Sequence, residues 1–173
     1  MPDHSPTDSG FLRGLRVLVD AEIEFILVGV AAINFYARDA SRAFYTLDAD
    51  ALVAPNISNL RRALQALASA GFALEARGEP FLDLDDEEVL SRILQVGANL
   101  IARDDDGTHL DLMLSITGFS YPELEEDARP FEVAGATLWV GRLEKLLRSK
   151  ELSGRPKDIQ FLRQFMAQAL DDE

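Results

Sequence analysis

The sequence predicts an α/β (or α+β) fold in which helices flank a mixed β-sheet and a pair of helices closes the chain. Three observations support this fold class. Short apolar runs alternate with segments of helical spacing in the first half of the chain. Two pairs of strand-like segments around glycine turns follow. The last thirty or so residues carry two helical patterns in succession.

The first half alternates strictly between element types. The expected elements are a helix over 10–22, a strand over 25–29, a helix over 30–37, a loop over 38–46, a strand over 47–53 and a helix over 57–70. The first strand is a short apolar run that ends at Gly29, and Ala54-Pro55 ends the second. Asn56 is a good N-cap for the following helix, and Gly71 is placed to end it.

The second half adds antiparallel pairs and the closing helices. The expected elements are an edge strand over 72–76, a helix from the acidic run Asp83 to Glu88 up to about Val96, a hairpin of 98–103 with 108–114, a hairpin of 131–134 with 136–140, and helices over 142–152 and 156–170. Negative charge favours a helix N-terminus, which places a helix start in the acidic run. Gly107 and Gly135 provide the turns, and Pro156 suits the first turn of the last helix.

Length and composition indicate one ordinary globular domain. A chain of 173 residues with 47% hydrophobic residues can bury one core, which we expect over 10–173 after a short disordered tail at 1–9. No apolar run approaches the roughly 20 residues of a membrane helix, and the start does not resemble a signal peptide. We therefore expect a cytoplasmic protein without membrane contact. The absence of cysteine excludes disulfides, thiolate metal sites and cysteine nucleophiles.

The net charge of −13 argues against broad nucleic-acid binding, because an acidic surface repels phosphate backbones. Residues 142–163 are the exception, since this segment carries seven basic side chains against three acidic ones. Local contact with nucleic acid is possible only there. A solvated helical face is the alternative interpretation of the same segment.

Strand alternation predicts a group of carboxylates. Successive side chains on a strand point to opposite faces, so Thr46, Asp48 and Asp50 share one face of the extended segment 46–53. Asp111 and His109 share a face of a later strand, opposite its leucines. If the two strands pair, three carboxylates converge. The same Asp-x-Asp spacing at other positions lies in polar runs, whereas Asp48 and Asp50 lie in an apolar strand, where unpaired charge is costly.

Converging carboxylates repel one another unless cations lie between them. Oxygen ligands of this kind suit Mg²⁺ or Mn²⁺, and two such ions can clamp the attacking and leaving oxygens of a phosphoryl displacement. Gly29, between a strand and a helix, predicts backbone N–H groups that could hold phosphate, although such turns often require glycine for other reasons. For His109, a structural or exposed role and a role behind the metal ligands remain open.

These residues resemble the DNA polymerase β-like nucleotidyltransferase superfamily. The similarity is greatest to its small bacterial branch, which contains minimal nucleotidyltransferases and the nucleotidyltransferase-like toxins of type IV toxin–antitoxin systems. The matching stretches are FILVGVAAINFY (25–36), TLDADALV (46–53), HLDLML (109–114) and LEKLLRSKELSGRPKDIQFL (143–162). The resemblance spans about 20–165, and it implies the nucleotidyltransferase fold.

The resemblance also implies roles for individual residues. Asp48, Asp50 and Asp111 would be the catalytic residues and the ligands of Mg²⁺ or Mn²⁺, with Asp111 favouring deprotonation of the attacking hydroxyl. The nucleoside triphosphate would be bound by Gly29, Val30, Thr46, Lys150, Arg155 and Asp158, with Asp158 orienting Lys150 or Arg155. The implied reaction transfers a nucleoside monophosphate to a hydroxyl of a protein, a tRNA or a small molecule.

The sequence departs from the family pattern near the nucleotide. Val30 stands where the family has glycine or serine, and Phe44 stands where an arginine is frequent, with Arg38 or Arg42 as possible substitutes. These departures favour a second hypothesis, a module that retains the fold and binds a nucleotide or a protein partner such as an antitoxin without turnover. A metal-dependent hydrolase is a third hypothesis, and it has little support because the chain has only two histidines.

Overall fold

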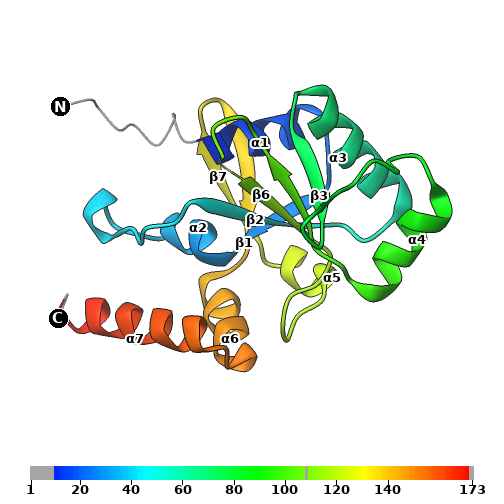
Figure 1. Ribbon diagram of the computed structural model, residues 1–173. Helices are drawn as coiled ribbons and strands as arrows, with labels where there is room; N and C mark the ends of the chain where they lie inside the picture. Colours follow the sequence, from blue (N-terminus) through cyan, green and yellow to red (C-terminus); the bar gives the residue numbers. More distant parts are fainter. Residues whose placement is uncertain (1–9, 108, 172–173) are drawn as a thin grey trace.

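A computed structural model describes residues 10–107 and 109–171 (Figure 1). Eight strands form one mixed sheet in the order β4-β3-β5-β6-β2-β1-β8-β7. The strands are β1 (Phe25–Val28), β2 (Asp48–Val53), β3 (Ala73–Ala76), β4 (Glu79–Pro80), β5 (Leu100–Arg103), β6 (His109–Met113), β7 (Arg129–Val133) and β8 (Ala136–Val140). This mixed α/β architecture confirms the predicted fold class.

The centre of the sheet brings distant parts of the sequence together. Strand β1 pairs antiparallel with β2, and β2 pairs parallel with β6. The register places Asp50 opposite Asp111. Ala49 and Leu110 are also opposite one another and are fully buried, so one face of this strand pair belongs to the core and the other carries the polar side chains.

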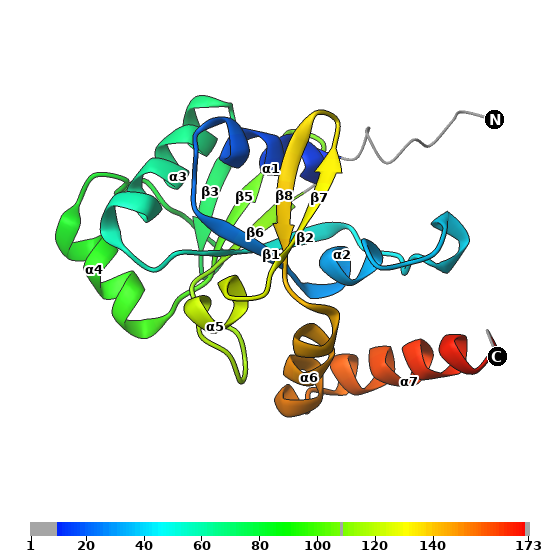
Figure 2. The ribbon, with the colours of Figure 1, turned by 180° about the vertical axis from the view of Figure 1, so that it is seen from behind.

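Helices lie on both sides of the sheet. They are α1 (Gly10–Asp20), α2 (Gly29–Asn34), α3 (Ile57–Ser69), α4 (Glu87–Val96), α5 (Tyr121–Glu125), α6 (Leu143–Ser153) and α7 (Pro156–Leu170). Figures 1 and 2 both place α1 and α3 on one side and the pair of α6 and α7 on the other. Gly14 of α1 packs against Leu110, so α1 covers the apolar face of β6. The opposite, polar face of β2 and β6 is therefore the one that lies toward α6.

Several local signals determine the ends of these elements as the sequence predicts. The Asn56 side chain accepts a hydrogen bond from the Asn59 amide at 2.9 Å and caps α3. Gly71, with a φ of +91°, follows the end of this helix. Pro156 begins α7. The two predicted hairpins form as β5 with β6 and β7 with β8.

The strand predicted over 72–76 forms as β3, but the prediction that it lies at the edge of the sheet is wrong. Strand β3 pairs with β5 on one side and with β4 on the other, so the two-residue β4 forms the edge. Pro80 suits that position, because a proline has no backbone donor for a further neighbour.

The helix expected from the acidic run forms as α4 and begins near the end of that run, whereas two other elements were not predicted. Asp86 caps α4 by accepting from the Glu88 and Val89 amides, so the earlier part of the run lies outside the helix. The expected loop over 38–46 contains a 3₁₀ turn at Ala40–Arg42. Helix α5 was missed, although Ser120 and Glu123 form a capping box that the sequence spacing indicates.

Two predicted features include residues outside the described part of the chain. The expected tail at 1–9 and position 108 of the second hairpin strand lie outside the described residues. Within the described part of the chain, none of the helices combines the length and the apolar character that crossing a bilayer requires.

Candidate active site

A two-by-two array of polar side chains lies on the open face of β2 and β6. The parallel register sets Asp48 beside His109 and Asp50 beside Asp111. Neighbouring strands lie about 4.8 Å apart, and alternate residues of one strand share a face, so the four side chains meet. The structure thus brings together the three predicted carboxylates, and it adds His109 to them.

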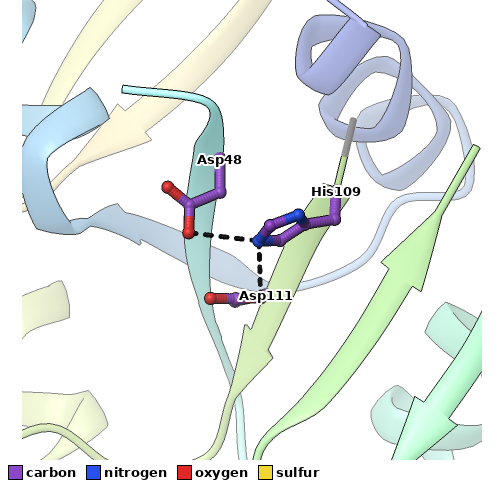
Figure 3. A group of neighbouring side chains, drawn as sticks. All are labelled: Asp48, His109 and Asp111. Carbon is purple, nitrogen blue, oxygen red and sulfur yellow. Dashed lines mark ion pairs between the residues drawn. The ribbon is translucent and has the colours of Figure 1, made fainter. Parts of the chain in front are cut away.

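Three members of this array could hold a metal ion together (Figure 3). Single ligand atoms of Asp48, His109 and Asp111 all lie within 4.8 Å of one another. His109 Nε2 is 3.3 Å from Asp48 Oδ2 and 3.9 Å from Asp111 Oδ1. Asp111 Oδ1 is buried and accepts no hydrogen bond from the described residues. Such an oxygen favours a cation, because an unpaired buried acceptor is costly.

Asp50 is the most strongly perturbed member of the array. Burial, the charge of Asp111 and that of Asp48 raise the pKa of the Asp50 carboxyl to about 7, and Lys150 opposes this shift. Burial also raises the pKa of Asp111. The metal-free site therefore disfavours full ionisation, and a bound cation would remove that penalty.

A prediction follows for the metal-free protein. The pKa of Asp50 rises from an ordinary value of 3.8 in the unfolded chain to about 7 in the folded protein. The folded state therefore retains a proton that the unfolded state has lost, and the free energy of unfolding decreases as pH rises from about 4 to about 7. We expect Asp50→Asn to reduce this dependence, by on the order of 3 kcal/mol, in urea unfolding with EDTA. Equal pH dependence in both proteins would contradict the perturbed state of Asp50.

Gly29 approaches Asp50 closely where β1 passes into α2. Its φ is +75°, a conformation that glycine adopts readily and other residues rarely adopt. A Cβ atom at this position would lie 2.1 Å from Asp50 Oδ2. Glycine is therefore required here both by the backbone and by the neighbouring carboxylate, which is a stronger reason than the sequence alone provides.

A cavity of about 420 Å³ lies between this array and the C-terminal helices. Five of the predicted site residues line it: Gly29, Asp50, Lys150, Arg155 and Asp158. Polar residues that the sequence did not indicate line it as well: Asn99, Ser115, Thr117, Ser149 and Ser153. The spacing of Ser149 and Ser153 around Lys150 could have indicated one face of α6. Ser115 and Thr117 follow the Asp111 strand directly.

Asp158 organises the basic side of the cavity. Its Oδ1 accepts from Lys150 Nζ at 3.1 Å, and its Oδ2 accepts from Arg155 Nε at 2.8 Å and from the Ser153 hydroxyl at 2.6 Å. Burial raises the pKa of Asp158, but the hydrogen bonds from Ser153, Lys150 and Arg155 outweigh burial and hold it below its ordinary value. Asp158 thus orients both predicted cations, and Lys150 is held with only 14% of its side chain exposed.

The other predicted residues lie beside the cavity. The Thr46 hydroxyl lies 3.0 Å from both the carbonyl oxygen and Oδ1 of Asp48, so Thr46 contacts a carboxylate of the array. Val30 packs against the hydrophobic core and is not among the described residues that line the cavity. Asp48 and Asp111 lie next to Asp50 on the sheet, outside that lining.

The fold and the site define an α/β protein with a carboxylate centre beside a partly basic cavity. No family model matches the chain, and no curated protein matches it. Among solved structures, the chain is similar to an antigenic nucleotidyltransferase-like protein from Paracoccidioides brasiliensis, with a TM-score of 0.49 and 16% sequence identity. That match covers 91% of this chain and 72% of the other.

Proposed function

We propose that this protein is a metal-dependent nucleotidyltransferase that transfers a nucleoside monophosphate from a triphosphate to a hydroxyl acceptor. One observation carries the proposal: Asp50 belongs to the carboxylate array and also lines the cavity that holds Lys150 and Arg155. Metal ions bound by the carboxylates and the positive charges of Lys150 and Arg155 would therefore face the same polyphosphate from two sides.

The donor set fits hard divalent ions. Asp48, Asp50 and Asp111 would hold them, since carboxylate oxygens are the ligands that Mg²⁺ and Mn²⁺ prefer. Asp111 Oδ1, which accepts no hydrogen bond from the described residues, and the raised pKa of Asp50 both indicate carboxylates whose negative charge is incompletely balanced. When bound, such ions stabilise the charge that develops on the phosphate oxygens.

The side chains of the protein support each part of the transfer. The acceptor oxygen forms a bond to the α-phosphorus, the bond between the α-phosphorus and the bridging oxygen breaks, and pyrophosphate leaves with the bonding electrons. Asp111 would complete the metal site next to Asp50 and favour loss of the hydroxyl proton there through its negative charge. Lys150 and Arg155 line the cavity and would bind the phosphates, and Asp158 holds both of them in place.

Val30 supports a second candidate function. It provides no side-chain hydroxyl for a phosphate, so the chain could bind a nucleotide without turning it over. Its partly buried side chain packs against the core, which leaves room for a ligand in the cavity. Binding without transfer would distinguish this module from the enzyme.

Calorimetry with each nucleoside triphosphate, with and without Mg²⁺ or Mn²⁺, tests the proposed function. We expect binding that requires the metal ion. A triphosphate labelled at the α-phosphate should then transfer its label to protein, RNA or small-molecule acceptors from a cell extract. Binding without any transfer would favour the nucleotide-binding module, and failure of every triphosphate to bind would reject both nucleotide functions and leave a module that binds a protein partner.

Lys150→Met tests the basic side of the cavity. The substitution removes the charge and retains an aliphatic chain for packing near Phe161, whose ring centre lies 5.0 Å from Lys150 Nζ. We expect triphosphate affinity to decrease about 10- to 100-fold, because a charge-assisted hydrogen bond contributes about 1.5–3 kcal/mol. Binding of the corresponding nucleoside should change less than about twofold.

The control for Lys150→Met is Arg148→Met on the same helix. Arg148 pairs with Glu151 at 2.8 Å and does not belong to the described lining of the cavity. Calorimetry should give nearly unchanged triphosphate affinity for this variant. Equal losses of triphosphate and nucleoside affinity in Lys150→Met would mean that Lys150 does not contact phosphate.

A further inference from the structure

A row of polar side chains leads from β3 across the sheet to the carboxylate array. Glu75, Arg103, His109 and Asp48 come from β3, β5, β6 and β2, which are neighbours in the sheet. Arg103 Nε donates to Glu75 Oε2 at 2.9 Å. A second nitrogen of the same guanidinium lies 3.4 Å from His109 Nδ1. His109 Nε2, at the other end of the ring, lies 3.3 Å from Asp48 Oδ2 (Figure 3).

The chemistry of this row determines which ring nitrogen of His109 carries the proton. A guanidinium group has N–H donors and no acceptor. A hydrogen bond across the contact with Arg103 makes Nδ1 the acceptor and places the ring proton on Nε2. That N–H faces the two carboxylates, at 3.3 Å from Asp48 and 3.9 Å from Asp111.

We propose that His109 is a positioning residue that holds Asp48 through its Nε2–H, and that it does not bind the metal ion although it lies among the potential ligands. This inference rests on the proposed function of the carboxylate centre. A nitrogen that carries a proton has no lone pair for a metal ion. To become a ligand, His109 would have to move its proton to Nδ1, where two donors would then face each other across the 3.4 Å contact.

Two groups hold Asp48 from different sides under this proposal. The Thr46 hydroxyl lies 3.0 Å from Oδ1, and the His109 ring faces Oδ2 at 3.3 Å. Glu75 limits the movement of Arg103 away from the ring, since it accepts from Nε of the same guanidinium. The metal ligands are therefore carboxylate oxygens only. This set suits Mg²⁺ and Mn²⁺, and it lacks the imidazole nitrogen that Zn²⁺ and Ni²⁺ prefer.

Nitrogen-15 NMR of the histidine rings tests the tautomer directly. The chain has two histidines, so the spectrum of His109→Leu assigns the signals of His109. We expect the Nε2–H tautomer in the metal-free protein, unchanged after addition of Mg²⁺. Arg103→Met should weaken the preference for the Nε2–H tautomer, because it removes the donor that faces Nδ1 while Asp48 still faces Nε2. A proton on Nδ1, or a shift of the Nε2 signal to that of a coordinated nitrogen with Mg²⁺ or Zn²⁺, would overturn the proposal.

Metal titrations without nucleotide separate a positioning residue from a ligand. His109→Leu should lower the affinities for Mg²⁺ and Mn²⁺ by the same factor, about tenfold, and His109→Gln should restore most of the loss through its amide N–H. A ligand would instead show a much larger loss for Mn²⁺ than for Mg²⁺, and no rescue. If the wild-type protein binds no divalent ion, the proposed function fails, while the NMR experiment still decides the tautomer of His109.

Discussion

Asp48→Asn combined with Asp50→Asn is expected to abolish metal-dependent nucleotide binding while the protein stays folded. The two substitutions remove two of the three carboxylates that converge on the open face of β2 and β6. An amide oxygen carries no net charge, so the remaining Asp111 cannot balance divalent ions next to a polyphosphate. We expect nucleotidyl transfer to fall by on the order of 1,000-fold or more.

The same double variant should be at least as stable as the wild-type protein without metal. Burial and the charges of Asp111 and Asp48 raise the pKa of Asp50, which means that its ionised form is unfavourable in the folded state. A neutral asparagine removes that cost at neutral pH. Thermal unfolding in EDTA should therefore give an equal or higher midpoint, and a large decrease would mean that the carboxylates stabilise the fold instead.

Asp83→Asn combined with Asp85→Asn is the matched control. This pair has the same spacing and loses the same charge, but both residues are exposed and lie outside the helices and strands. Nucleotide binding by this control should equal that of the wild-type protein. If the Asp48 and Asp50 variant also retains normal metal-dependent binding, the carboxylate array is not the metal centre.

The sequence predicted the face of each strand better than it predicted the neighbours of each strand. Alternation along a strand is local, so the shared face of Asp48 and Asp50 follows from seven consecutive residues. The meeting with Asp111 depends on the parallel pairing of β2 with β6, which lie far apart in the chain. Local patterns do not determine such a pairing, and the prediction was therefore conditional on it.

The sequence left two roles open for His109, a structural or exposed one and one behind the metal ligands, for a related reason. The residue is ordinary in its own strand, and its environment comes from Asp48 on β2 and Arg103 on β5. Ser115 and Thr117 likewise line the cavity together with residues of α6, an arrangement that local sequence does not indicate. In contrast, the family resemblance of 143–162 predicted Lys150 and Asp158 together, and the hydrogen bond between them lies within that one segment.

Gly29→Ala is expected to disrupt the site and to destabilise the protein. The backbone at Gly29 has a φ of +75°, and an alanine there costs about 1–2 kcal/mol. The new Cβ would lie 2.1 Å from Asp50 Oδ2 and 3.0 Å from Asp50 Cγ, so the carboxylate would have to rotate away. We expect loss of metal-dependent nucleotide binding in calorimetry, together with a lower midpoint in thermal unfolding.

Gly135→Ala separates the two contributions at Gly29. Gly135 has a φ of +77°, and a Cβ there would meet nothing within 4 Å, so its alanine variant carries a similar backbone cost without a contact. Equal destabilisation of both variants, with nucleotide binding lost only in Gly29→Ala, would assign the functional loss to displacement of Asp50. If Gly29→Ala binds nucleotide normally, the position of Asp50 against β1 is unimportant for the ligand. In that case Asp50 would have to reach the metal ion from another rotamer, and the close approach to Gly29 would belong only to the metal-free state.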